Sequence, residues 1–194
     1  MSQSGGDRLK PIDQRDLVIL GMLSVACFLV DSSIGLVLIP FIPIPLVGGL
    51  ASAFFEAALL YICANIVPRL GAATILATIW LAMATVTPSF GPPGAYKIVI
   101  GVALGISAEL VLVVLGRRPF AYMIAIAVAF ALSIPITYYA WVRVGIPDAD
   151  KLRGYILYLM SIYVLIGIVG CFAGKKFFDA RLLKYPTIMR IRER

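Results

Sequence analysis

Histidine is absent from the 194 residues of this chain, and charged residues make up only 14% of them. Soluble domains are roughly a quarter charged, so this composition excludes an ordinary water-soluble domain. Without histidine the chain lacks the commonest general base and a common zinc ligand. It also lacks a G-x-x-x-x-G-K-[ST] motif, which excludes ATP hydrolysis by a P-loop. We therefore expect a protein that is not an enzyme and that needs no metal and no cofactor.

Cysteine is scarce too. Cys27, Cys63 and Cys171 lie singly inside apolar runs, and no two of them have C-x-x-C spacing. We therefore interpret all three as buried free thiols.

The first sixteen residues mix acids and bases with Pro11 before any apolar run, which is not the order of a cleavable signal peptide. We therefore expect the first apolar run to remain in the protein as a membrane helix.

Hydrophobic residues make up 61% of the chain and are arranged in long runs. About 20 apolar residues cross a hydrocarbon core of about 30 Å, and breaks at proline, glycine and charge delimit six such runs. The sequence thus predicts an all-α integral membrane protein with six transmembrane helices in the cell membrane. Residues 1–16 and 175–194 are the predicted tails, and 17–174 the transmembrane domain. The predicted helices span residues 17–30, 47–67, 70–87, 98–115, 119–141 and 154–174.

Prolines mark two special places along these runs. Pro40, Pro43 and Pro45 cannot continue a regular helix, so IPFIPIP is predicted to be a loop that caps or re-enters the outer face. Pro135 predicts a kink within the fifth helix.

Lysine and arginine predict the orientation in the membrane. If the six runs alternate in direction, the two tails, Arg69, Arg117 and Arg118 place 13 basic residues on one side and leave four on the other. Basic residues favour the cytoplasm, so both ends are predicted to be cytoplasmic. The segments Ser89–Tyr96 and 143–153 are then extracytoplasmic. The basic C-terminal tail suits the anionic inner leaflet.

Carboxylates within the apolar runs are the first candidates for a binding site. An acid near the bilayer centre costs about 3 kcal/mol on insertion scales, so Glu56 and Glu109 are expected to face the bundle interior. Gly101 and Gly105 precede Glu109 at intervals of four residues and leave space on the same helix face. Each acid could instead be protonated or paired with a neighbouring helix, and the glycines could serve close helix packing. Asp31 is interpreted as a residue at a helix end or in a loop.

Aromatic residues gather at the outer ends of the last three predicted helices. Such residues commonly form an interfacial belt. They could also line an outward-facing pocket with stacking walls and a cationic rim. An electron-poor heterocycle or an anionic group would suit that pocket. The candidate residues are Tyr96, Lys97, Tyr138, Trp141, Tyr155 and Tyr158, with Gly105, Glu56 and Glu109 deeper in the membrane.

The run GAYKIVIGVALGISAELVLVVLGRR, with RLGAATI and SFGPPG before it, resembles the substrate-binding S components of energy-coupling-factor (ECF) vitamin transporters. It is most similar to the group assigned to thiamin precursors such as hydroxymethylpyrimidine, whose Gly-x-x-Ala-Glu element reads Gly105, Ala108 and Glu109 here. The resemblance covers residues 45–120 and, beyond them, only helix count and topology. Ala77 and Ala84 stand where that group usually has carboxylates.

This resemblance implies six helices, an outer pocket and no catalysis. It also implies a membrane-embedded coupling subunit and two ATP-hydrolysing subunits as partners, with Gly21, Ser24 and Ala26 as docking residues on the first helix. The function expected from it is high-affinity binding of a vitamin or vitamin precursor, a thiamin-related pyrimidine above all, for ATP-driven uptake. From the residues alone, a solitary small-solute transporter or channel and, third, an intramembrane enzyme remain open.

Overall fold

The computed structural model describes residues 12–38, 47–88, 91–147, 149–185 and 188. Within these ranges the chain is helical and forms no strand. The elements, in chain order, are α1 (Gln14–Leu38), α2 (Val47–Ile66), α3 (Ala72–Met83), η2 (Ala84–Val86), α4 (Tyr96–Leu115), α5 (Pro119–Val144), α6 (Ala149–Arg153), α7 (Ile156–Ala180) and η3 (Leu182–Lys184).

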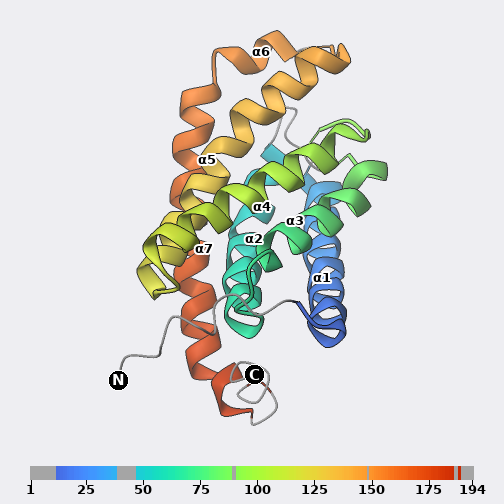
Figure 1. Ribbon diagram of the computed structural model, residues 1–194. Helices are drawn as coiled ribbons and strands as arrows, with labels where there is room; N and C mark the ends of the chain where they lie inside the picture. Colours follow the sequence, from blue (N-terminus) through green and yellow to red (C-terminus); the bar gives the residue numbers. More distant parts are fainter. Residues whose placement is uncertain (1–11, 39–46, 89–90, 148, 186–187, 189–194) are drawn as a thin grey trace.

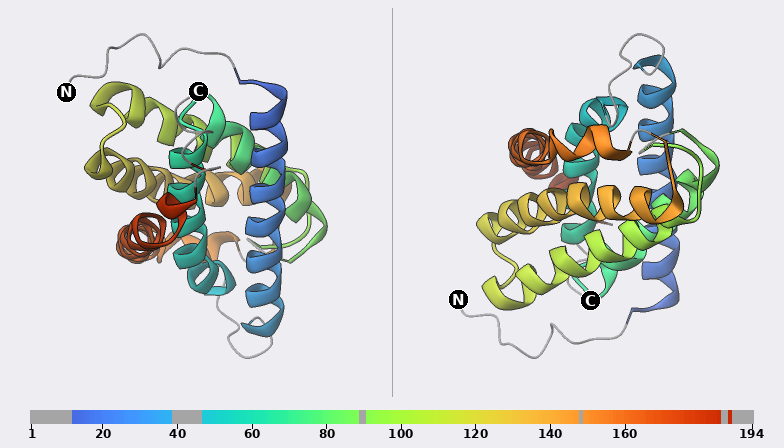
Figure 2. Two further views of the ribbon diagram at one scale, coloured as in Figure 1. Left: turned by 90° about the horizontal axis from the view of Figure 1, so that it is seen from below. Right: turned by 90° about the horizontal axis from the view of Figure 1, so that it is seen from above.

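The helices form two layers (Figure 1). In one layer α2 packs between α1 and α7, and in the other α4 packs between α3 and α5. Contacts of α1 with α3 and of α5 with α7 join the layers at their edges. The two views of Figure 2, along the vertical of Figure 1, show α7 nearly end-on, α1 along its length, and α4 and α5 crossing the molecule side by side. The buried core therefore lies between the two layers.

Local sequence explains where α5 begins and ends. Arg118 is extended, with φ −99° and ψ 154°, and Pro119 opens the helix, where its missing N–H is no loss. Gly145 ends the helix in the left-handed region, at φ 74°, which glycine adopts without strain. The helix continues through Pro135. It ends at Val144, three residues beyond the predicted end at Trp141.

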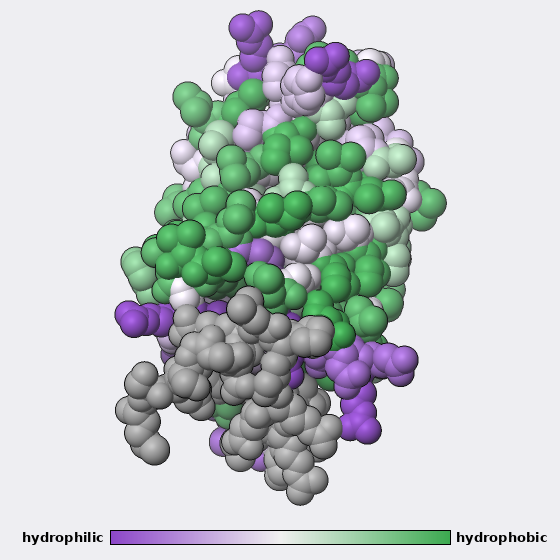
Figure 3. Space-filling view, in the orientation of Figure 1, coloured by the Kyte–Doolittle hydropathy of each residue, from purple (hydrophilic) through white to green (hydrophobic). Residues whose placement is uncertain are grey.

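On the face shown in Figure 3, apolar side chains cover the middle of the molecule, and hydrophilic ones lie toward its upper end and beside the grey part of its lower end. Four helices in the described part are long and apolar enough to cross a membrane, and two shorter apolar helices accompany them. The long ones are Gln14–Val37, Tyr96–Leu115, Pro119–Val144 and Ile156–Lys184, and the shorter ones are Ser52–Ile66 and Ala72–Val86. The predicted all-helical membrane architecture is confirmed in this form, while six crossings stay a prediction.

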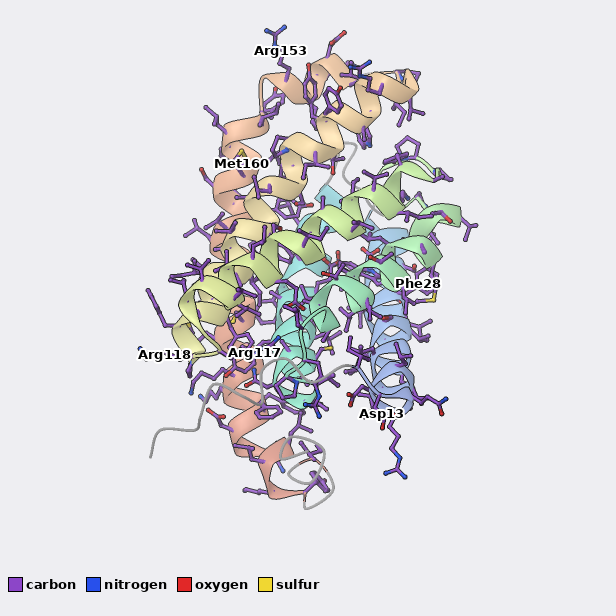
Figure 4. All side chains as sticks on the ribbon, in the orientation of Figure 1. Asp13, Phe28, Arg117, Arg118, Arg153 and Met160 are labelled. Atoms are coloured by element: carbon purple, nitrogen blue, oxygen red, sulfur yellow. The ribbon has the colours of Figure 1, made fainter. Side chains whose placement is uncertain are left out.

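The first residues of α1 and the last residues of α7 lie in the lower part of the molecule in Figure 1. Asp13, Arg117 and Arg118 lie toward that end, and Arg153 lies at the opposite end (Figure 4). The arrangement agrees with the alternation assumed in counting basic residues. Which end faces the cytoplasm stays a prediction.

Several predicted boundaries shift. The first helix does not end at Asp31 but continues to Leu38, and the last helix begins at Ile156 and continues to Ala180, six residues into the predicted tail. A short helix, α6, occupies part of the segment predicted as a loop. The predicted proline-rich loop falls on residues 40–45, outside the described residues.

Candidate functional site

Two buried carboxylates face each other across α1 and α2. The side chains of Asp31 and Glu56 have no exposed surface, and their charges interact. Ser52, one turn before Glu56, donates a hydrogen bond of 2.9 Å from its Oγ to Asp31 Oδ1. Asp31 lies about 10 Å from the end of α1, and Glu56 about 14 Å from the start of α2, so both lie well inside the bundle.

The interpretation of Asp31 as a helix-end or loop residue was therefore wrong. The hydrogen bond from Ser52 and the surrounding helices allow a carboxylate inside α1, so the helix continues for two more turns. Asp31 and Ser52 were both missed as site residues. An acid and a serine 21 positions apart give no sequence signal of being neighbours, because their contact depends on how α1 packs on α2.

Tyr163 of α7 brings a third polar group to this acid pair. Its side chain is buried and lies close enough to Asp31 and Glu56 to interact with both charges. Its ring contacts Phe130 edge-to-face, with centroids 6.2 Å apart. From the sequence, only its place on the small-residue face of α7, one heptad from Gly170, could have indicated a buried tyrosine.

Lys97 supplies a positive charge near the acids. Its side chain is fully buried, and its Nζ donates hydrogen bonds of 3.0 Å to Ala84 O and 2.6 Å to Thr87 O. These carbonyls end α3 and η2, where a cation is favourable. The charge of Lys97 also interacts with Asp31. Lys97 was expected at a pocket rim, but its bonds to the end of η2 hold it in the interior.

The predicted aromatic residues divide into two groups. Tyr96 and Trp141 are buried, and Tyr138 is half-buried against the core. Tyr96 donates a hydrogen bond of 2.6 Å to Pro92 O, and a Cβ on Gly91 would overlap the Trp141 ring, so the 91–95 segment is packed on these two side chains. Tyr155 and Tyr158, by contrast, are 61% and 66% exposed. The structure brings only the first group toward the interior.

The interior face of α5 is more polar than was predicted from the sequence. Ser133, Thr137 and Trp141 follow one another at intervals of four residues and are all buried. On α3, Trp80 is also fully buried. We group these side chains with the acid pair, Lys97 and Tyr163 under the name buried polar cluster, which is defined by their burial in the bundle. Its members are Asp31, Ser52, Glu56, Trp80, Lys97, Ser133, Thr137, Trp141 and Tyr163.

Glu109 lies away from this cluster, next to the start of α3. Its Oε1 accepts a hydrogen bond of 2.9 Å from Ala73 N–H, and its Oε2 lies 3.6 Å from Arg117 Nη2. Gly105 lies against α3, since a Cβ there would overlap the Thr74 backbone. Glu109 is thus an acid paired with a neighbouring part of the bundle, and Gly105 permits close helix packing, which are the two alternatives left open by the sequence. Their predicted part in ligand binding stays untested.

Ionic contacts continue from Glu109 across one end of the bundle. Arg117 Nη2 donates a hydrogen bond of 2.7 Å to Arg69 O, and Arg69 Nε lies 3.5 Å from Asp16 Oδ2. Arg69 lies between α2 and α3, and Arg117 between α4 and α5. This inner network, made of Asp16, Arg69, Arg117 and Glu109, joins α1 and α4 to the segments between α2 and α3 and between α4 and α5, and it was not foreseen from the sequence.

The three predicted docking residues differ in position. Ser24 is fully buried, and its Oγ lies 2.7 Å from Leu20 O and 3.1 Å from Leu76 O of α3, so it is not available to a partner and that prediction was wrong. A methyl group at Gly21 would meet no atom within 4 Å, and Ala26 is half-buried. The exposed face of α1 beside Gly21 carries Val18, Met22, Val25 and Leu29.

The described residues contain no group of three His, Cys, Asp or Glu side chains placed to hold a metal ion. The buried polar cluster contains two acids, several hydroxyl groups and aromatic rings inside an apolar bundle. Such a set can hold a small polar molecule by hydrogen bonds and ring contacts.

The fold is similar to a solved structure described as the crystal structure of an S-component of ECF transporter. The TM-score is 0.59 over 87% of this chain and 84% of that chain, and 21% of the residues are identical. No protein-family model matches the chain. No curated protein matches it in sequence. At this identity the likeness concerns the fold, and this protein has the fold of an ECF transporter S component.

Proposed function

We propose that this protein is the substrate-binding S component of an ECF transporter. The observation that carries the proposal is the fold likeness to an S component over 87% of the chain. The resemblance of residues 45–120 to the same group of proteins supports it independently, because it rests on sequence motifs. The protein would capture a small molecule within the membrane and would perform no catalysis itself.

The proposed substrate is a vitamin or vitamin precursor, with a thiamin-related pyrimidine favoured by the motif at Gly105, Ala108 and Glu109. The buried polar cluster is the proposed binding site, because it combines acids, hydroxyl groups and aromatic rings in an apolar interior. Among the residues predicted from the sequence, Glu56, Lys97 and Trp141 belong to this cluster, Tyr96 precedes Lys97 on α4, and Tyr138 of α5 is half-buried against the core.

The proposed setting is the cell membrane, crossed six times with both ends in the cytoplasm. The buried polar cluster would then lie in the outer half of the bilayer, and the inner network of Asp16, Arg69, Arg117 and Glu109 at the cytoplasmic end. Uptake would require a membrane-embedded coupling subunit with two ATP-hydrolysing subunits. The exposed apolar face of α1 is a candidate surface for the coupling subunit.

The test is a binding experiment on the purified protein. Native mass spectrometry of the detergent-solubilised chain should detect a retained small molecule, and calorimetric titration with hydroxymethylpyrimidine and thiamin should show saturable binding. A solitary channel would show neither retained ligand nor saturable binding. If liposomes that contain this chain alone let the solute cross their membrane, the proposal is wrong and a solitary transporter or channel takes its place.

A further inference from the structure

Glu56 differs from the other buried carboxylates in what surrounds its oxygens. Ser52 and Asp31 lie close by, yet neither oxygen of Glu56 has a hydrogen-bond partner of acceptable geometry among the residues that the structure describes. Asp31 accepts a bond from Ser52, and Glu109 accepts one from Ala73 N–H. In the described part of the chain, Glu56 is thus the fully buried acid whose two oxygens are both left for another molecule.

A carboxyl group in this position is costly for the bundle. Buried polar groups are nearly always hydrogen-bonded, and an acid inside a membrane usually marks a functional site. Glu56 has no exposed surface, so solvent at the molecular surface does not supply the missing bonds. A bound molecule that donates to both oxygens would supply them.

The charges around Glu56 select the kind of molecule. Asp31 and Cys27 face it from α1, Ser52 precedes it on α2, and Tyr163 faces it from α7. The nearby cation is Lys97, which interacts with Asp31 and already donates to Ala84 O and Thr87 O. The two acids outnumber the one ammonium, so this place disfavours an anionic ligand and favours one that brings N–H donors and positive charge.

We infer that Glu56 is the receptor for an amidine-like edge of the ligand, meaning two parallel N–H donors that carry positive charge. A carboxylate binds such an edge through both oxygens, with bonds stronger than neutral ones. A protonated aminopyrimidine has this edge, formed by its ring N–H and its amino group. The inference rests on the proposed function and assigns the ligand's polar contact to Glu56 in α2.

The test compares two ligands on the parent protein and on two matched variants. Calorimetric titration in detergent is done with hydroxymethylpyrimidine and with its oxo analogue, in which oxygen replaces the amino group. The parent should bind the amino compound at least about tenfold more tightly than the oxo compound. Glu56→Gln should weaken binding of the amino compound by about tenfold or more, because glutamine keeps the volume but loses the charge. Asp179→Asn, which removes the charge of an exposed acid that pairs with Lys175 near the end of α7, should leave the affinity unchanged.

The outcomes separate the inference from the proposed function. Equal affinity for the amino and oxo compounds in the parent, a result that does not depend on any variant folding, overturns the inference and leaves binding intact. So does unchanged affinity in Glu56→Gln. Preferred binding of the carboxylate vitamins biotin or pantothenate keeps an S component and overturns a cation-selective Glu56. If none of these compounds binds, both proposals fail for this set of ligands.

Discussion

A Cβ on Gly105 of α4 would overlap the Cα of Thr74 in α3, so the two helices touch through their backbones at Gly105. Gly101 makes a similar approach one turn earlier, where a Cβ would lie 2.7 Å from Ala77 O. Small residues at helix interfaces permit such close packing in membranes. The same two glycines fix how α4 presents Lys97 and Tyr96 at one end and Glu109 at the other.

Gly105→Ala should lower the stability of the bundle. A methyl group there has no room unless the backbone of α3 moves, and overpacking of this kind costs about 1–3 kcal/mol. The midpoint of thermal unfolding in detergent should therefore fall. Gly21→Ala is the matched control, because a methyl group at Gly21 meets no atom within 4 Å. An unchanged midpoint in Gly105→Ala would show that α3 and α4 are not in backbone contact.

Glu109→Gln should reduce stability more than affinity. Its Oε1 bonds to Ala73 N–H and its Oε2 pairs with Arg117, so loss of the charge weakens the inner network. Bonds to charged groups contribute about 1.5–3 kcal/mol. A lower unfolding midpoint with an unchanged dissociation constant is expected. Weaker binding with an unchanged midpoint would instead return Glu109 to the ligand site, as its sequence motif suggests.

The starts of the six long helices could be predicted from the sequence to within three residues, because proline, glycine and charge interrupt the apolar runs, whereas some ends were less accurate. The predicted and observed starts agree at Val47 and at Pro119. The rule failed at Asp31, where an acid was interpreted as a break. A carboxylate inside an apolar helix is stable when a neighbour such as Ser52 bonds to it, and that neighbour is known only once the packing is known.

The candidate site was less predictable than the fold. Periodicity placed Gly101, Gly105 and Glu109 on one face of α4, yet it could not say that α3 covers that face. For the same reason Tyr155 and Tyr158 were grouped with the buried aromatic residues although both are mainly exposed. A single helix reveals which residues share a face, whereas a site depends on which helix faces it.

Accessibility from the two sides of the membrane should differ between Arg118 and Arg153, which lie toward opposite ends of the molecule (Figure 4). Each is exposed and can be replaced by cysteine in a background without the three buried native cysteines. In intact cells an impermeant thiol reagent should label Arg153→Cys, and only cell disruption should expose Arg118→Cys. Labelling of both from outside would contradict the predicted orientation.

Gly21→Leu should weaken assembly with a coupling subunit while leaving ligand binding intact. Gly21 adjoins the exposed face of α1 that carries Val18 and Met22, and it lies about 15 Å along the helix from Asp31. A leucine there keeps a partner helix from approaching closely, and its Cβ meets no atom of the described bundle within 4 Å. The measurement is the amount of tagged coupling subunit, co-expressed with its two ATP-hydrolysing subunits, that is recovered with the variant and with the parent.

Val114→Leu, on the exposed surface of α4, is the control for an added apolar group in another helix. Equal recovery with Gly21→Leu and with the parent would place the docking surface elsewhere than on this face of α1.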